Sequence, residues 1–206
     1  MKHLDFPLIL ASQNPHKLQE FGSLLPPDWK LEPAPLFACE ENAATYLGNA
    51  LLKAYAVQTL QPDSWVLADD SGLEVEALEN RPGIFSARYG GAALTDTERN
   101  HLLLKELAGA EERGARFVCC LVLLAPPASS GKRVYIAQSC FYGRIAHQAR
   151  SVQEKPFGYD PIFELSKAYH PDLAGKTLAE LDPRQKNKIS HRRLACTKLR
   201  NLFSDQ

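Results

Sequence analysis

The 206-residue chain carries 24 basic and 24 acidic side chains, so its formal net charge is zero when the histidines are neutral. This balance excludes a protein that coats nucleic acid through bulk positive charge, and any recognition of phosphate must therefore be local. Hydrophobic residues make up 45% of the chain, which is enough for one large globular domain or two small lobes that share a core.

Membrane and redox signals are missing from the sequence. No run of about eighteen apolar residues occurs, and the opening MKHLDFPLILASQN lacks the apolar region and cleavage pattern of a signal peptide. We therefore expect a cytoplasmic protein with no membrane partner. The five cysteines are scattered without a CxxC spacing, which predicts neither a disulfide framework nor a zinc site.

The first predicted elements are a strand and a helix joined by a polar turn. Residues 8–11 form a short apolar run that is typical of a buried strand. The polar stretch 12–15 ends it, and apolar residues then recur at helical spacing until the prolines at 26–27 stop the helix. A second helix is expected from Thr45 to about Leu60. Its expected apolar face consists of Leu47, Leu51, Ala54 and Val57.

The apolar run 65–68 predicts another buried strand, which ends on two adjacent carboxylates, Asp69 and Asp70. Ser71 and Gly72 follow as a predicted turn. Adjacent like charges cost free energy unless solvent, a cation or a proton compensates them. The segment alone leaves two interpretations open, a solvated turn and a site for a hard cation.

A helix and a hairpin are expected next. Thr95 and Glu98 have the spacing of a capping box, and leucines continue the helical pattern to Gly109. Two β-rich runs follow at 116–124 and 133–142. The Pro-, Ser- and Gly-rich stretch between them suits a hairpin loop.

The last predicted helix opens with Asp182 as its N-cap and Pro183 at its first position. Its apolar stripe consists of Ile189, Cys196, Leu199 and Phe203. Because strands and helices interleave along the chain, we expect an α/β fold, and the hairpin predicts a mixed sheet. No repeat or linker interrupts the pattern, so residues 1–206 are expected to form one domain.

Two candidate anion and cation sites lie in the first third of the chain. The turn 12–17 offers free N–H groups at a helix N-terminus, with Ser12 and Lys17 as additional donors. A plain helix cap would explain the same residues. Residues 40–41 are both glutamate and precede the predicted helix that carries Lys53. Glu40 or Glu41, together with Asp70, could supply the carboxylates that a hard divalent cation needs. The alternative is a solvated acidic loop with an exposed lysine.

Two further candidate segments lie toward the C-terminus. Phe157-Gly158-Tyr159-Asp160-Pro161 combines aromatic faces with a carboxylate, which suits a heterocyclic base, although a β-turn with core aromatics would contain the same residues. The stretch 186–192, KNKISHR, places Lys186 and Ser190 on one face of the last helix, with His191 beside them. These side chains form either a set of donors for carbonyl oxygens or a solvent-facing basic surface.

In their order along the chain, these motifs resemble the family of inosine/xanthosine triphosphate pyrophosphatases, enzymes that act on non-standard purine nucleotides. The resemblance extends from Leu8 to about Leu202. It is carried by SQNPHK, EENAATYLGNALLKA, ADDSGLEVEALENRPGIFSARYGG, FGYDPIF and AELDPRQKNKISHR. It implies an elongated mixed β-sheet with flanking helices that forms two lobes around a central cleft. It also implies a homodimer.

The resemblance assigns a role to each matching position. The triphosphate would be held by Ser12, Gln13, Asn14, Pro15, His16 and Lys17. The catalytic residues would be Asp70, the base that activates water, together with Asp69 and Lys53. The cofactor Mg²⁺ would be bound by Glu40 and Asp70. The remaining contacts to the purine nucleoside triphosphate would come from Ser71, Phe157, Gly158, Tyr159, Asp160, Lys186, His191 and Arg192.

Three positions depart from the family pattern, and two other functions remain open. Ala43 and Gly48 replace a commoner glycine and a commoner acidic residue, and Pro156 precedes FGYD where glycine is frequent. The alternatives are a Maf-like pyrophosphatase of other base specificity and a non-catalytic nucleotide-binding protein. The KNKISHR segment argues against the first, and the acids Glu40, Asp69 and Asp70 argue against the second.

Overall fold

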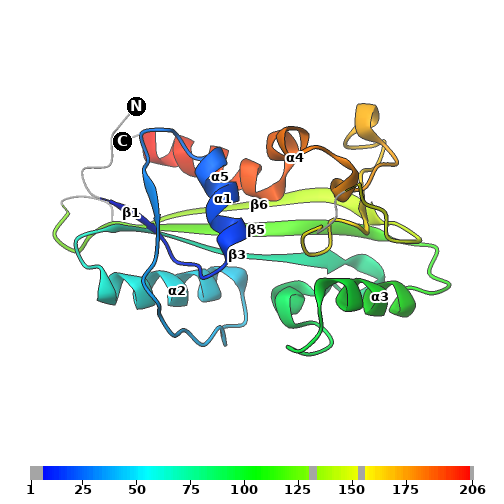
Figure 1. The fold of residues 1–206 in the computed structure, drawn as a ribbon, viewed down its shortest axis with the longest axis horizontal. Coiled ribbons are helices and arrows are strands. Elements are labelled where there is room, and N and C mark those ends of the chain that lie inside the picture. Colours follow the sequence, from blue (N-terminus) through cyan, green and yellow to red (C-terminus); the bar gives the residue numbers. More distant parts are fainter. Residues whose placement is uncertain (1–6, 130–133, 153–155, 205–206) are drawn as a thin grey trace. The chain divides into compact units, whose positions relative to one another are not determined.

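The computed structural model describes residues 7–129, 134–152 and 156–204, and these residues form a mixed α/β fold (Figure 1). The strands are β1 (Leu8–Leu10), β2 (Leu31–Pro33), β3 (Trp65–Val75), β4 (Arg81–Pro82), β5 (Gly114–Leu124), β6 (Val134–Ile145) and β7 (Phe163–Glu164). The α-helices are α1 (Pro15–Leu24), α2 (Tyr46–Leu60), α3 (Asp96–Glu106), α4 (Pro183–Ile189) and α5 (His191–Ser204). The short 3-10 helices are η1 (Glu76–Leu78), η2 (Gly83–Arg88), η3 (Pro171–Leu173) and η4 (Leu178–Glu180).

The strands form a single mixed sheet within the described part of the chain. Their order is β2-β1-β3-β5-β6-β7, and β4 pairs with β3 outside this path. Strand β1 is parallel to β2 and to β3, whereas β4 is antiparallel to β3 and β7 is antiparallel to β6. The expected α/β class, with a mixed sheet and flanking helices, is therefore confirmed.

The chain divides into two compact units, each assembled from separate segments. The first unit comprises residues up to Asp70, residues 119–139 and the residues from Ser190 onward. The second unit comprises residues 71–118 and 140–189. Strands β3, β5 and β6 contribute residues to both units, because the division falls within each of them.

The core of the first unit lies on both faces of its strands. Successive side chains of a strand point to opposite faces, so Leu8 and Leu10 of β1 pack with α1 and α5. Ile9 packs on the other face, with Ala50 and Val57 of α2. Figure 1 shows this arrangement, with α2 and α5 on opposite sides of β1.

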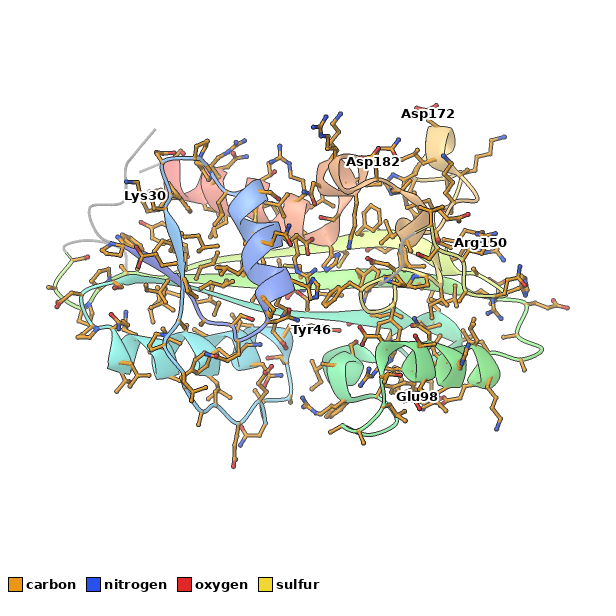
Figure 2. The ribbon with its side chains drawn as sticks, viewed as in Figure 1. Lys30, Tyr46, Glu98, Arg150, Asp172 and Asp182 are labelled. Carbon is orange, nitrogen blue, oxygen red and sulfur yellow. The ribbon has the colours of Figure 1, made fainter. Side chains whose placement is uncertain are left out.

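The second unit has a core of its own. Leu103 and Leu107, from the end of α3, pack with Leu73 of β3, Phe117 of β5 and Phe163 of β7. The capping box predicted at the start of α3 is confirmed: the Thr95 hydroxyl accepts from the Glu98 N–H, and the Glu98 carboxylate accepts from the Thr95 N–H. Figure 2 labels Glu98 on this first turn.

The expectation that a strand ends at Ala68, before an acidic turn, is wrong. Strand β3 continues through Asp69, Asp70, Ser71 and Gly72 to Val75, and both aspartates are buried. The two carboxylates can lie inside a strand because cationic side chains of the first unit compensate their charge, as described below. The run of apolar residues ends at Ala68, but the extended backbone continues to Val75.

The predicted last helix is also different, because it is two helices. Helix α4 ends at Ile189 and α5 begins at His191. Between them the hydroxyl of buried Ser190 accepts a hydrogen bond from the Arg193 N–H at 3.2 Å, which is the pattern of a helix N-cap. Lys186 and Ser190 therefore do not share a helix face, and they belong to different units.

The buried face of α2 differs from the predicted one. Ala54 and Val57 are buried as expected, but Leu47 and Leu51 are only partly buried. Their expected place is taken by the polar residues Asn49 and Lys53, which are 0% and 6% exposed. A buried polar face indicates that this helix supplies a site as well as a core.

The remaining expectations for the elements agree with the structure. Helix α1 ends at Leu24, before the predicted proline stop, and Thr45 caps α2. Strands β5 and β6 are neighbours in the sheet. The tip of their connection, with Arg133, lies outside the described residues. No helix in the described ranges is both long enough and apolar enough to cross a membrane.

Candidate active site

The turn that was predicted to bind phosphate joins β1 to α1. Asn14 caps the helix by accepting the His16 N–H at 2.9 Å, and the Ser12 hydroxyl accepts the Asn14 N–H at 3.2 Å. Gln13 donates to the Pro35 carbonyl at 3.0 Å, whereas Pro15 and His16 are exposed. The turn is therefore a helix cap, because Pro15 has no N–H and the His16 and Lys17 N–H groups both donate to Asn14.

Lys17, from the first turn of α1, reaches the buried Asp69 in β3. Its Nζ lies 2.7 Å from Asp69 Oδ1, and Arg192 Nε lies 3.7 Å from Oδ2. Burial alone would raise the pKa of Asp69, but the charges of Lys17, Arg192 and Lys53 hold this pKa well below its usual range. Asp69 is therefore held in its charged form by three cations, Lys17, Arg192 and Lys53.

Asp70 faces a different set of partners. Lys53 Nζ lies 3.2 Å from Asp70 Oδ1, and Asn49 Nδ2 donates to Asp70 Oδ2 at 3.2 Å. Burial raises the pKa of Asp70 and the charge of Glu41 adds to this effect, although Lys53 and Asn49 oppose it. A carboxylate whose affinity for a proton is raised, next to fixed donors, has the property expected of a general base.

Lys53 joins Asp70 to Glu41. Its Nζ lies 2.8 Å from Glu41 Oε2 and 3.2 Å from Asp70 Oδ1. Burial would lower the pKa of Lys53, but Asp69, Asp70 and Glu41 together raise it, so the ammonium group is charged. The structure thus brings together Lys53 and Asp70 as predicted, and it adds Glu41.

Glu40, the predicted partner of Asp70 in metal binding, is exposed, and Glu41 is the glutamate that lies on Lys53. No group of three or more His, Cys, Asp or Glu side chains suited to a metal occurs among the described residues.

His191 and Arg192 open α5 and are both buried. Arg192 Nη1 lies 2.8 Å from Glu20 Oε2, and its guanidinium lies over the ring of Phe21. The predicted solvent-facing alternative does not hold for these two residues. Glu20 of α1 was missed by the sequence analysis, because an acid on a helix carries no local signal that it will meet an arginine far along the chain.

The aromatic segment 157–160 belongs to the second unit, together with Lys186. Asp160 is buried and its Oδ2 lies 2.5 Å from Lys186 Nζ. The Tyr159 hydroxyl donates to the Ser86 carbonyl at 2.9 Å, and burial raises the pKa of this phenol. Phe157 and Gly158 are half-buried, as is Ser71 in β3. Two of the predicted base-site residues, Asp160 and Lys186, are thus an ion pair.

One polar residue that the motifs did not single out, Asn49, holds part of the first site in place. Asn49 donates to Asp70 and accepts the Ala43 N–H at 3.0 Å, so it links the acidic loop to β3. The sequence contains a weak signal for it, because Asn49 lies one helical turn before Lys53 and therefore shares its face.

The fold and these charges define a class of protein. A buried lysine between two carboxylates, with further cations around a neighbouring acid, suits the hydrolysis of a phosphoanhydride, which depends on positioning and charge neutralisation. The mixed α/β sheet is the scaffold for these groups.

The chain belongs to the Ham1 family, whose profile matches residues 8–202. It is 43% identical over 194 residues to a dITP/XTP pyrophosphatase of Gloeobacter violaceus, covering 93% of this chain and 91% of the relative. Its structure resembles the Ham1 protein of Staphylococcus aureus with a TM-score of 0.81 and 35% identity, covering 97% of this chain and 98% of that one. A HAM1 protein of Coxiella burnetii matches with a TM-score of 0.78 and 35% identity, covering 98% and 100%.

Proposed function

We propose that this protein hydrolyses non-standard purine nucleoside triphosphates, namely ITP, dITP and XTP, to the monophosphate and pyrophosphate. Membership of the Ham1 family and the names of the relatives, which are dITP/XTP pyrophosphatases, support this reaction. The observation that carries it is Lys53, held charged and nearly buried between Asp70 and Glu41. A charged ammonium group held in this way can neutralise the charge that develops on a polyphosphate during hydrolysis.

The phosphate groups are assigned to the first unit. The N-terminus of α1 is the positive end of the helix dipole, and Lys17 and Lys53 supply further positive charge. Asp69 holds Lys17 in place, so the ammonium group needs no reorganisation when an anion binds. Asp70 accepts a proton from the water that attacks the α-phosphorus, and the bond to the pyrophosphate leaving group breaks.

The donor set also fits a magnesium ion. Asp70 and Glu41 are hard oxygen ligands that both lie on Lys53 Nζ. Bound Mg²⁺ would neutralise charge on the triphosphate and make the attacking water more acidic. Gly48 stands where the family commonly has an acid. Because Glu40 is exposed and Glu41 lies on Lys53, we assign the second carboxylate to Glu41 in place of the predicted Glu40.

The base is assigned to Phe157, which would stack on the purine, and to His191 and Arg192, which would read its edge. Hypoxanthine and xanthine carry a 6-keto oxygen, which accepts hydrogen bonds, whereas adenine presents an amino donor. Opposing donors would leave buried groups unpaired, and such a mismatch discriminates by roughly 10⁴-fold. The ion pair between Asp160 and Lys186 fixes the segment that carries Phe157.

The experiment that tests the function is pyrophosphate release with Mg²⁺ from ITP, dITP and XTP, compared with ATP, GTP, CTP and UTP. We expect a strong preference for the first three, abolished by EDTA. Activity centred on pyrimidine nucleotides would support the Maf-like alternative instead. Binding of ITP without turnover would indicate the non-catalytic nucleotide-binding protein.

We further infer a homodimer that works in the cytoplasm and removes these nucleotides before polymerases incorporate them into DNA or RNA. The resemblance to the pyrophosphatase family supports this inference. Light scattering of the purified protein tests the dimer, and a mass of 22.9 kDa would indicate a monomer instead.

A further inference from the structure

Two side chains of α3 hold the segment that carries Phe157. The Asp96 carboxylate accepts the Gly158 N–H at 2.8 Å, and Asn100 Nδ2 donates to the Gly158 carbonyl at 2.9 Å. Asp96 and Asn100 are four residues apart on the helix and therefore lie on the same face, one turn from each other. All of these residues belong to the second unit.

The two hydrogen bonds restrain the backbone on both sides of Gly158. The N–H belongs to the peptide that joins Phe157 to Gly158, and the carbonyl belongs to the peptide that joins Gly158 to Tyr159. Between them Gly158 has a φ of +56°, a left-handed conformation that glycine adopts without steric cost. A glycine is also the residue with the most conformational freedom, so external contacts must select this state. Asp96 and Asn100 supply those contacts.

Asp96 is available for this role because other residues satisfy the helix N-terminus. Thr95 accepts the Glu98 N–H, so the first turn of α3 does not need Asp96 as a cap. The second oxygen of Asp96 lies 3.1 Å from Arg99 Nη1. Arg99 also donates to the Leu94 carbonyl at 2.9 Å, which fixes the carboxylate in the orientation that reaches Gly158.

Asn100 is buried at a cost to stability. It is 3% exposed, and within the described residues its Oδ1 has no hydrogen-bond partner. A buried acceptor left unsatisfied destabilises a fold, and an apolar side chain of similar shape would avoid this penalty. The presence of a buried amide at Asn100 is therefore explained by the hydrogen bond that its Nδ2 donates to the Gly158 carbonyl.

We propose that Asp96 and Asn100 are positioning residues for base selection, because they set the backbone of Gly158 and with it the orientation of the Phe157 ring. This inference rests on the proposed function, in which Phe157 stacks on the purine. The downstream side of the segment is anchored separately, by Tyr159 on Ser86 and by Asp160 on Lys186. Loss of either α3 contact would remove a restraint on the backbone between Phe157 and Tyr159.

The test compares Asp96→Ala and Asn100→Leu with the wild-type protein, using ITP and ATP as substrates. A stacked base that can shift no longer aligns its polar edge with its hydrogen-bond donors. The kcat/KM for ITP therefore falls more than the kcat/KM for ATP. We expect the KM for ITP to rise about tenfold, which corresponds to the loss of one hydrogen bond. The ratio of kcat/KM between ITP and ATP falls by a similar factor, while kcat for ITP changes much less.

Two further variants separate positioning from a general structural defect. Asp96→Asn keeps an acceptor oxygen for the Gly158 N–H and restores most of the selectivity. Thr97→Ala changes an exposed residue of the same turn and leaves selectivity unchanged. Hydrogen exchange of the Gly158 amide accelerates in Asp96→Ala and not in Thr97→Ala.

The outcomes distinguish this inference from the function on which it rests. A wild-type protein that hydrolyses none of the triphosphates overturns the proposed function and this inference with it. A wild-type protein that prefers ITP, with Asp96→Ala and Asn100→Leu variants of unchanged selectivity, overturns the positioning role alone. Equal losses of kcat for ITP and ATP, without a change in KM, also overturn it.

Discussion

Asp69 and Asp70 are neighbours in β3, yet their side chains meet different partners because successive residues of a strand point to opposite faces. Asp69 lies on Lys17 and near Arg192, and its pKa is lowered. Asp70 lies on Lys53 and Asn49, and its pKa is raised. The first carboxylate therefore stabilises the fold in its charged form. The second retains affinity for a proton, as a catalytic base requires.

The first prediction follows from this difference. Asp70→Asn should reduce turnover by about 10³-fold or more, as expected for a lost general base, with little change in the free energy of unfolding. Asp69→Asn should lower that free energy by about 3 kcal/mol, because it leaves buried cations uncompensated. Steady-state assays and urea unfolding of both variants check this. An active Asp70→Asn protein would remove Asp70 from its proposed role.

A second prediction separates the two neighbouring glutamates. Glu41→Gln should raise the Mg²⁺ concentration needed for half-maximal activity by about tenfold or more, because Glu41 lies on the Lys53 ammonium group that also contacts Asp70. Glu40→Gln is the matched control, since Glu40 is exposed. Binding of Mn²⁺ to the protein without nucleotide, measured by calorimetry, gives a second readout. The reverse result would restore Glu40 as the ligand.

At the scale of the elements, the break between α4 and α5 places parts of one motif in two units. The KNKISHR segment contributes Lys186 to the second unit, where it pairs with Asp160, and Arg192 to the first, where it pairs with Glu20. Ser190 makes this division by capping the new helix. Both helices are therefore anchored by ion pairs close to the break.

The cap itself is open to a test. Ser190→Ala should lower the free energy of unfolding by about 1 kcal/mol, the usual cost of losing an N-cap hydroxyl. Thr197→Ala serves as the control, because it removes a hydroxyl that only bonds the Arg193 carbonyl inside the same helix. Urea titrations measure the free energy of unfolding of both variants. If the two variants have equal stability, Ser190 does not act as a cap.

A different feature of the elements explains two departures from the family pattern. A Cβ atom at Gly48 would lie 2.6 Å from the Ala43 Cβ, so the two residues are complementary. With alanine at position 43, the first turn of α2 has no room for a side chain at position 48. The methyl group of Ala43 therefore occupies the space that a side chain at position 48 would need, so the two departures from the family pattern are linked.

At the scale of the whole molecule, the two units share strands. Strands β3, β5 and β6 contribute residues to both, and they are consecutive in the sheet. Melting one unit would therefore remove hydrogen-bonding partners from strands that continue into the other. This continuity favours a single cooperative transition.

We accordingly predict coincident unfolding curves from two probes. Trp29 and Trp65, the two tryptophans of the chain, both lie in the first unit, where each contacts the ring of Phe203. Tryptophan fluorescence therefore reports this unit, whereas far-UV circular dichroism reports both. Urea midpoints should agree within error. Separate midpoints would indicate that the units unfold independently.

The sequence by itself determined the elements whose signals are local. Buried strand β1, the start of α2 at Thr45, the capping box of α3 and the neighbouring strands β5 and β6 all follow from periodicity and capping within a few residues. The ordered motifs likewise indicated the family and singled out Lys17, Lys53, Asp69 and Asp70. The structure brings these four side chains together in the first unit.

Only the tertiary structure decided which polar groups are buried and what they meet. Strand β3 runs through two aspartates because cations from α1, α2 and α5 compensate them, and no property of the local sequence indicates those partners. For the same reason Glu41 could not be separated from Glu40, and Asn100 was not recognised at all. The free energy of a buried charge depends on groups that are distant in the chain, whereas helix and strand signals depend on near neighbours.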